Sequence, residues 1–269
     1  MTAIAFSRFS SGNGINDNGQ VVGQTNITPP YPGEPPSQAF LYSYRNNSTV
    51  VIDNVAERPS DAYGINNAGQ VTGSLSTLPC TGAGPFQVCN LGDTHAFSYA
   101  GAGLVDIGTL GGTFSQGTSI NNLDQIAGIS TVAASTLNHL FLYAQGHMND
   151  LGTVSGESFV NAIINDHGEI VGTAVNSVGA ATSFIRGATG FKRLPLIAGG
   201  LNNGGVIVGS NVVANGSSHA FLYIGGQSID LNDLVDPSLT LLTTATGVSN
   251  NGKIVAKGLN GHLYVLTPR

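Results

Sequence analysis

Apolar and polar residues alternate in short runs along this chain. Runs such as Gln20–Gly23 and Gln38–Tyr42 are separated by stretches rich in Gly, Asn and Pro. A period of two places the apolar side chains on one face of a strand, whereas an amphipathic helix needs apolar residues three or four positions apart over several turns. Because helical spacing is not sustained in any segment, the pattern predicts short antiparallel strands and an all-β protein.

Three phrases recur along the chain. The first is Asn-x-x-Gly between β-branched residues, as in Gly14–Gly23, and it predicts a tight hairpin in which Gly has a positive φ and Asn caps the turn. The second is centred on Phe, as in His95-Ala96-Phe97, and the third carries Asp before an aliphatic residue, as in Asp106-Ile107. The hairpin begins at positions 16, 66, 121, 165, 202 and 249, so the chain contains six copies of about 47 residues.

Four short strands in each of six copies are typical of β-propeller blades. The sixth copy stops after its third strand, His262–Leu266, while the segment Ala3–Phe9 before the first hairpin reads as an additional strand. We therefore predict a single domain over residues 1–269, an all-β, six-bladed β-propeller of four-stranded antiparallel blades, whose ring is closed by the N-terminal strand 3–9 completing blade six. An open solenoid and a two-sheet sandwich are the alternatives.

Copies three and four depart most from the repeat. Asp124 stands where the turn Gly belongs in copy three. In copy four, Thr182 and Arg186 replace the His and Tyr of the second phrase, and Lys192-Arg193 replaces the acid of the third. We expect distortion in these two blades.

The phrases resemble the HAF family of extracellular bacterial repeats, which is named for His-Ala-Phe. The resemblance rests on His95–Phe97, on His219–Phe221, on Gly-Ile-Asn at Gly14 and Gly64, and on Asp106–Gly112, which matches the family's Asp-Leu-Gly-Thr-Leu-Gly-Gly element. It covers nearly the whole chain and implies a secreted bacterial repeat protein with a propeller-like fold. It implies no catalytic residue.

Composition narrows the classes of function. Hydrophobic residues make up 41% of the 269 positions and charged residues only 9%, which disfavours both a coiled coil and a charge-rich disordered chain. Nine basic against 15 acidic residues give a net charge of −6, so we expect no nucleic-acid partner. No apolar stretch approaches the roughly 18 residues that cross a bilayer, and we expect no membrane insertion. Residues Met1–Arg8 do not read as a signal peptide.

Cys80 and Cys89 are the two cysteines of the chain, and both lie in a polar, Gly-rich connection. Their proximity predicts a disulfide that fixes a long loop in an oxidising compartment. Two free thiols are the alternative, and a metal site is disfavoured because no His lies beside them.

Two connections between predicted strands, Thr25–Ser37 and Leu75–Thr94, are unusually long. In a propeller such loops lie on the same face as the connections between blades, and Pro reduces the entropy lost when a loop becomes ordered on a partner. This loop-bearing face is our candidate binding site, with mere solvent loops as the alternative. The candidate binding residues are Tyr31, Arg58, Tyr63, Phe86, Phe114 and Phe159.

Candidate catalytic groups on the same face are Arg58, Asp61, Tyr63 and Glu157, which offer acid, base and charge-stabilising functions. No nucleophile elbow, phosphate loop or zinc-protease motif accompanies them. The repeated histidines His95, His139, His219 and His262 are interpreted as structural bonds within each blade, because equivalent positions on neighbouring blades are too far apart to share one metal ion.

We expect no cofactor and no metal site, with one open alternative. The acidic group Asp230, Asp233 and Asp236 either caps a short helical turn, which we favour, or binds a structural cation.

The sequence therefore predicts a secreted or cell-surface propeller that binds a glycan, a protein or a small molecule through one loop-bearing face. One alternative is an enzyme, a hydrolase, lyase or cyclase, with its site at the mouth of the central channel. A second is a structural module of a surface assembly.

Overall fold

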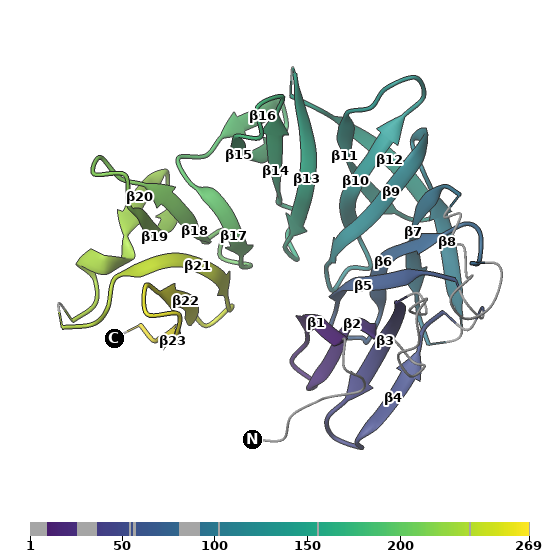
Figure 1. The fold of residues 1–269 in the computed structure, drawn as a ribbon, viewed down its shortest axis with the longest axis horizontal. Coiled ribbons are helices and arrows are strands. Elements are labelled where there is room, and N and C mark those ends of the chain that lie inside the picture. Colours follow the sequence, from purple (N-terminus) through teal and green to yellow (C-terminus); the bar gives the residue numbers. More distant parts are fainter. Residues whose placement is uncertain are drawn as a thin grey trace. The chain divides into compact units, whose positions relative to one another are not determined.

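A computed structural model of the chain describes residues 10–25, 37–53, 55, 58–80, 92–101, 103–154, 156–236 and 238–268. The chain divides into two compact units, residues 1–153 and 154–269, and each is described by itself. Across these described ranges the regular structure consists of β-strands and one short 3₁₀ turn (Figure 1). The prediction of an all-β protein is confirmed.

The first unit holds three copies of the repeat. One antiparallel sheet has the order β1-β2-β3-β4, while the next two copies, which we expected as separate blades, are joined into an eight-stranded sheet by a single parallel bridge between Thr94 of β7 and Phe114 of β9. The strands are β1 (Ser10–Ile15), β2 (Gln20–Thr25), β3 (Gln38–Ser43), β4 (Ser48–Val51), β5 (Ser60–Ile65), β6 (Val71–Ser76), β7 (Thr94–Tyr99), β8 (Leu104–Gly108), β9 (Gly111–Ile120), β10 (Ile126–Val132), β11 (Asn138–Ala144) and β12 (His147–Gly152).

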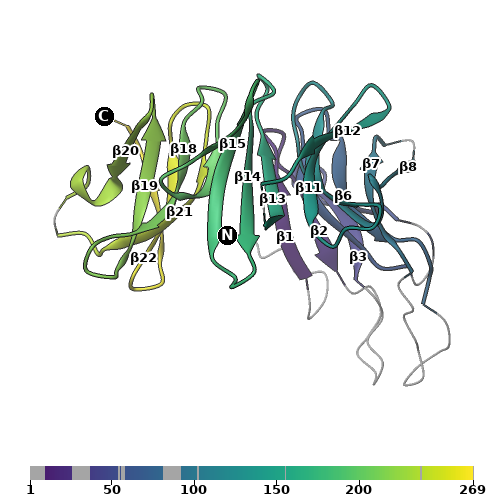
Figure 2. The same ribbon diagram turned by 90° about the horizontal axis from the view of Figure 1, so that it is seen from above.

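The second unit holds the other three copies. Two four-stranded antiparallel sheets, β13-β14-β15-β16 and β17-β18-β19-β20, are followed by the three-stranded sheet β21-β22-β23 (Figure 2). The strands are β13 (Glu157–Ile164), β14 (Ile170–Asn176), β15 (Ala181–Gly187), β16 (Gly190–Arg193), β17 (Ile197–Leu201), β18 (Ile207–Val212), β19 (Ser218–Ile224), β20 (Gln227–Asp230), β21 (Leu242–Val248), β22 (Ile254–Gly258) and β23 (Leu263–Leu266). The expected end of the sixth copy after its third strand is confirmed, whereas the expected strand 3–9 lies outside the described residues.

The second phrase of the repeat supplies the core. Phe40, Phe97 and Phe141 lie on the third strand of their copies and are at most 2% exposed. Ala39 and Ala96, which precede two of these rings, are fully buried as well. Adjacent residues of a strand point to opposite faces, so the burial of both Ala and Phe shows that these strands are covered on both faces at this point.

The Gly that closes the first phrase in copies one and two lies against the backbone of the strand opposite it. The first strand of each copy carries a β-bulge, which lies between Gly12 and Gly14 in β1 and between Ala62 and Gly64 in β5. A Cβ added to Gly23 would lie 1.8 Å from the carbonyl oxygen of Ser11, and one added to Gly73 would lie 1.9 Å from that of Asp61. A methyl group does not fit at that separation in these two copies unless the opposite strand shifts, whereas copy six holds Ala256 at the equivalent position.

The turn Asn has two functions, of which the sequence predicted only one. As expected of a cap, Oδ1 of Asn66 accepts hydrogen bonds from the backbone N–H groups of Ala68 and Gln70, and Gly69 has a φ of 81°. Its Nδ2 also donates to the carbonyl oxygen of Asn121 in the next copy, at 3.0 Å. We call this hydrogen bond, from the turn Asn to the carbonyl oxygen of the next copy, the clasp. The equivalent clasps join Asn16 to Asn66 in the first unit, and Asn165 to Asn202 and Asn202 to Ser249 in the second. The Asn side chains therefore tie neighbouring copies of the repeat together.

The distortion expected in copies three and four is slight. Asp124 takes the left-handed conformation, with φ 62°, and the turn of copy three keeps its backbone hydrogen bond between Asp124 and Asn121. The sheet β13–β16 of copy four is a regular four-stranded meander. The departures in copy four thus change surface chemistry rather than the backbone.

Candidate functional site

Asp61 and Tyr63, two of the candidate residues, lie close together in the first unit. Both lie on β5, two positions apart, and Tyr63 is the extra residue of the bulge between Ala62 and Gly64. The hydroxyl of Ser37 donates to Oδ1 of Asp61 at 3.0 Å, and the Tyr63 hydroxyl lies 3.5 Å from Oδ2. Bulges commonly re-aim a side chain beside a binding site, and this one brings a phenol to a carboxylate.

The surroundings perturb both groups. Burial raises the pKa of Asp61 above its ordinary value, although the hydrogen bonds from Ser37 and Tyr63 oppose this rise. Burial, followed by the negative charge of Asp61, also raises the pKa of Tyr63, whose hydroxyl has Ser74 and Gln116 as further partners. A half-buried carboxyl group with a raised pKa beside a protonated phenol can accept a hydrogen bond or transfer a proton, which makes the pair a candidate site.

Arg58 belongs to a different cluster. Its guanidinium forms a two-pronged ion pair with Asp53, with Nε 2.7 Å from Oδ2 and Nη2 2.8 Å from Oδ1. Asp53 is 1% exposed, so loss of the arginine would leave a buried charge without its partner. Arg58 therefore stabilises the connection after β4, and the structure does not join it to Asp61.

The remaining candidates are distributed rather than gathered. Phe159 is fully buried and its ring packs 5.2 Å from that of Phe191, centroid to centroid, which corrects its assignment to a binding surface. Phe114 is half-buried at the bridge to Thr94 in the first unit, whereas Glu157 begins β13 in the second. The candidates Tyr31 and Phe86 lie outside the described residues. Cys80 is buried and Cys89 lies outside the described residues, so the disulfide stays a prediction.

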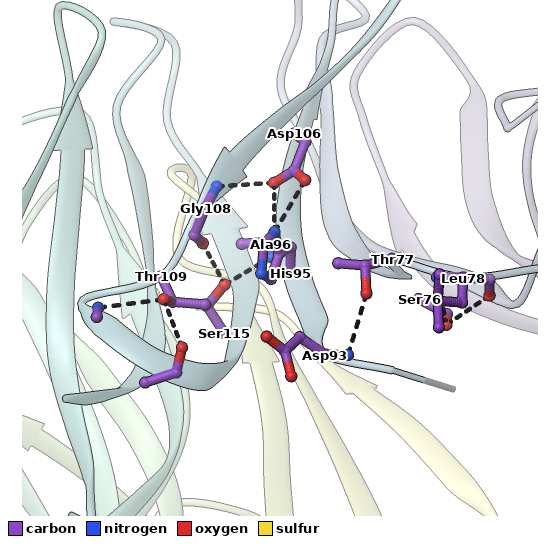
Figure 3. A network of polar contacts seen from close by, with 12 residues as sticks. Ser76, Thr77, Leu78, Asp93, His95, Ala96, Asp106, Gly108, Thr109 and Ser115 are labelled. Carbon is purple, nitrogen blue, oxygen red and sulfur yellow. Dashed lines mark hydrogen bonds and ion pairs between the residues drawn. The ribbon is translucent and has the colours of Figure 1, made fainter. Parts of the chain in front are cut away.

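Three of the repeated histidines are paired with the acid of the third phrase. Nδ1 of His95 lies 2.8 Å from Asp106, that of His139 lies 3.0 Å from Asp150, and that of His219 lies 2.5 Å from Asp230. Figure 3 shows the first pair beside Ser115, whose hydroxyl accepts from the backbone of Ala96 and donates to the carbonyl of Gly108. Each pair ties the third strand to the fourth, and the structural interpretation of these histidines is confirmed.

The acidic group near the 3₁₀ turn Leu231–Asp233 is a cap. The Asp230 side chain accepts from the backbone N–H of Asn232, as the favoured interpretation predicted. Burial opposes ionisation of Asp230, but the hydrogen bonds from His219 and Asn232 outweigh it and hold the pKa below its ordinary value. Among the described residues, no group of three His, Cys, Asp or Glu side chains is placed to hold a metal ion.

Sequence reasoning missed the neutral partners of the candidate site. Ser37, Ser74 and Gln116 come from three different segments, and Ser and Gln are common throughout the chain, so no local signal marked them. The His–Asp pairs had a usable signal, because each acid follows its histidine by 11 positions.

Comparison with known proteins identifies a fold. No protein-family model matches the chain, and no curated protein matches it in sequence. Among solved structures, the chain is similar to the β-propeller domain of the Trilobed protease from Pyrococcus furiosus, described as having an open velcro topology, with a TM-score of 0.62 and 10% identity over 98% of this chain and 83% of that one.

Two further structures are similar over most of the chain. One is an oligogalacturonate lyase in complex with manganese, with a TM-score of 0.53 and 12% identity, covering 86% of this chain and 72% of that one. The other is TolB from Acinetobacter baumannii, with a TM-score of 0.52 and 10% identity over 81% of this chain. The match spans 52%, about half, of the TolB chain. These similarities show a β-propeller fold and no specific function. Along the described part of the chain, no helix is long and apolar enough to cross a membrane.

Proposed function

We propose that this chain is a secreted or cell-surface β-propeller of the HAF type that binds a ligand through the loop-bearing face around Asp61 and Tyr63. The extracellular location is supported by the repeat phrases that resemble the HAF family. The binding role is supported by the carboxyl–phenol pair, because the repeat does not demand it: the positions equivalent to Asp61 in copies one and three hold Ser11 and Gln116. Residues that the fold does not require are the ones free to serve a ligand.

A hydroxyl-rich ligand, such as an oligosaccharide, suits this site best. Asp61 accepts hydrogen bonds, while the hydroxyls of Ser37 and Tyr63 and the amide of Gln116 donate or accept them. The one arginine nearby in sequence is held by Asp53 and adds no free positive charge. The observation that carries the proposal is the half-buried Asp61 with its raised pKa.

The test is a thermal-shift screen of the full chain against neutral oligosaccharides, followed by calorimetry on any that raise the Tm. We expect Asp61→Asn to weaken binding of the selected oligosaccharide at least about tenfold, which is the loss expected for one hydrogen bond to a charged group. Asp17→Asn is the matched control, because it makes the same change on an exposed turn where copy two has Asn67. Equal binding by the two variants would contradict the proposal.

An enzymatic role is the second candidate, and the raised pKa values of Asp61 and Tyr63 are the observation that favours it. A carboxyl group that keeps its proton to a higher pH can act as a general acid in a hydrolase or lyase. The same oligosaccharides, incubated with the chain and analysed by mass spectrometry, separate the two roles. Release of products that Asp61→Asn abolishes would assign an enzyme, and intact ligand would assign a binding protein.

We further propose that residues 1–269 form one six-bladed ring, closed by residues 3–9 as the fourth strand of the last blade. An apolar groove of about 900 Å³ runs beside β23 in the second unit. Leu263 and Val265 of β23 are 68% and 66% exposed, a degree of exposure that a covering strand would remove. The groove is lined chiefly by Leu222, Leu231, Leu234, Val265 and Leu266.

Deletion of residues 3–9 tests this closure. We expect the Tm to fall, because β23 loses its partner strand. The backbone amides of β23 that do not face β22 should then exchange faster with solvent. An unchanged Tm, with unprotected β23 amides already present in the full chain, would exclude this role for the N-terminal segment.

A further inference from the structure

Copy four reverses the charge of a repeated position. Copies two, three and five hold both the histidine and the acid of the His–Asp pair. In each of them the acid lies opposite the Phe of the second phrase: Asp106 opposite Phe97, Asp150 opposite Phe141 and Asp230 opposite Phe221. The residue opposite Phe184 in copy four is Arg193, and Thr182 takes the place of the histidine. The fold therefore does not need a cation at this position, and the change has left the backbone register intact.

Arg193 lines a small cavity in the second unit. The cavity has a volume of about 190 Å³ and lies where β16 connects to β17 and where β18 ends. Its polar side chains are Thr182, Arg193 and Asn211, and its apolar wall includes Pro195, Leu196 and Ile197.

Hydrogen-bond donors of Arg193 and Asn211 have no partner among the described residues. No described residue forms an ion pair or side-chain hydrogen bond with the guanidinium of Arg193. Asn211 uses its Oδ1 to accept from the backbone N–H of Val212, which leaves its Nδ2 group to donate. Thr182 lines the cavity and is only 8% exposed, so it is largely removed from bulk water.

We propose that this cavity binds the carboxylate group of a small organic acid or an acidic sugar. A guanidinium presents two parallel N–H donors that match the two oxygens of a carboxylate, and the hydroxyl of Thr182 and the amide of Asn211 supply further hydrogen bonds. One unpaired cation balances one negative charge, which favours a carboxylate over a doubly charged phosphate. This site is independent of Asp61 and does not rest on the function proposed for that residue.

Calorimetry with sodium D-glucuronate and the full chain tests the proposal, with D-glucose as the uncharged analogue. We expect D-glucuronate to bind, D-glucose to bind at least about tenfold more weakly, and added NaCl to weaken the binding of D-glucuronate because it screens an exposed charge. Equal affinity for the two sugars would overturn the proposal. Tighter binding of inorganic phosphate than of D-glucuronate would overturn the assignment to a carboxylate.

Three variants distinguish binding in this cavity from binding by general surface charge. The double variant Thr182→His with Arg193→Asp restores the pair found in copies two, three and five, so we expect it to fold with an unchanged or higher Tm and to lose D-glucuronate binding. Lys192→Asp is the matched control, because Lys192 is the adjacent exposed cation on the opposite face of β16 and does not line the cavity. Arg193→Gln provides a milder change if the double variant does not fold. Equal losses in Lys192→Asp and Arg193→Gln would overturn the proposal.

Discussion

At the scale of single residues, burial and hydrogen bonding shift two carboxyl groups in opposite directions. The pKa of Asp230 is lowered because hydrogen bonds from His219 and Asn232 favour its charged form. The pKa of Asp61 is raised because burial outweighs the hydrogen bonds from Ser37 and Tyr63. Asp230 thus stabilises the fold when ionised, whereas Asp61 carries a cost in stability of the kind found at functional sites.

This difference predicts opposite pH dependences for two matched variants. The contribution of Asp230 is present above the unfolded pKa of about 4 and is lost as the pH falls through the lower folded pKa, so Asp230→Asn should destabilise the chain at pH 7. Ionisation of Asp61 removes stability as the pH rises from about 4 through its raised folded pKa, so Asp61→Asn should stabilise the chain at pH 7. Urea unfolding at pH 3 and pH 7 measures both effects, and both differences should shrink at pH 3. A destabilised Asp61→Asn variant at pH 7 would contradict the assignment.

At this scale, the role of a residue could be predicted from the sequence where the residue recurs in several copies of the repeat. The His–Asp pairs recur at a fixed interval, and their role follows from that regularity. Asp61 was named as a candidate from its position on the loop-bearing face, but its partners Ser37 and Gln116 were not, since each comes from another segment and neither residue type is distinctive. Arg58 was misplaced because its partner Asp53 lies in the same connection, and a sequence does not indicate which acid an arginine selects.

At the scale of elements, the strands were predictable and their irregularities were not. The alternation of apolar residues located strands such as β2 and β3, and the Asn-x-x-Gly phrase located the hairpin before β2. The bulges in the first strands were missed, because a bulge is a property of two paired strands and leaves no mark in either one alone. The small residue that closes each hairpin was visible as a pattern, Gly in five copies and Ala256 in the sixth, and the reason for Gly became clear only when the opposite strand was in place.

Gly73 provides a direct test of that cause. A Cβ there would lie 1.9 Å from the carbonyl oxygen of Asp61 and 2.6 Å from the ring of Phe97, both of which are fixed by the sheet. We expect Gly73→Ala to lower the free energy of unfolding by about 3 kcal/mol or more, at the upper end of overpacking effects. Gly103→Ala is the control, since a Cβ at Gly103 meets no atom within 4 Å. Similar urea midpoints for the two variants would show that the bulge yields to the added methyl group.

At the scale of the whole molecule, the proposed ring places the sixth turn beside the first, and the sixth turn differs from the others. In each unit, the turn Asn of one copy donates to the carbonyl oxygen of the next, as Asn16 does to Asn66 and Asn202 does to Ser249. Ser249 stands at the Asn position of copy six, and its hydroxyl bonds within its own turn to Asn251 and Lys253. Since serine has no amide to extend toward Asn16, the seam of the proposed ring lacks the clasp found elsewhere.

Ser249→Asn therefore tests closure of the ring. In a closed ring the new Nδ2 reaches the carbonyl oxygen of Asn16 and adds about 1 kcal/mol, which corresponds to a rise in Tm of about 2–4 °C for a chain of this size. The new side chain can also improve its own turn, so the substitution is made in the full chain and in the chain lacking residues 3–9. The gain due to the clasp should disappear with the closing strand, whereas a gain confined to the turn should persist in both backgrounds. Equal gains in the two backgrounds would mean that the sixth and first turns do not meet, and the six copies would then form an open array.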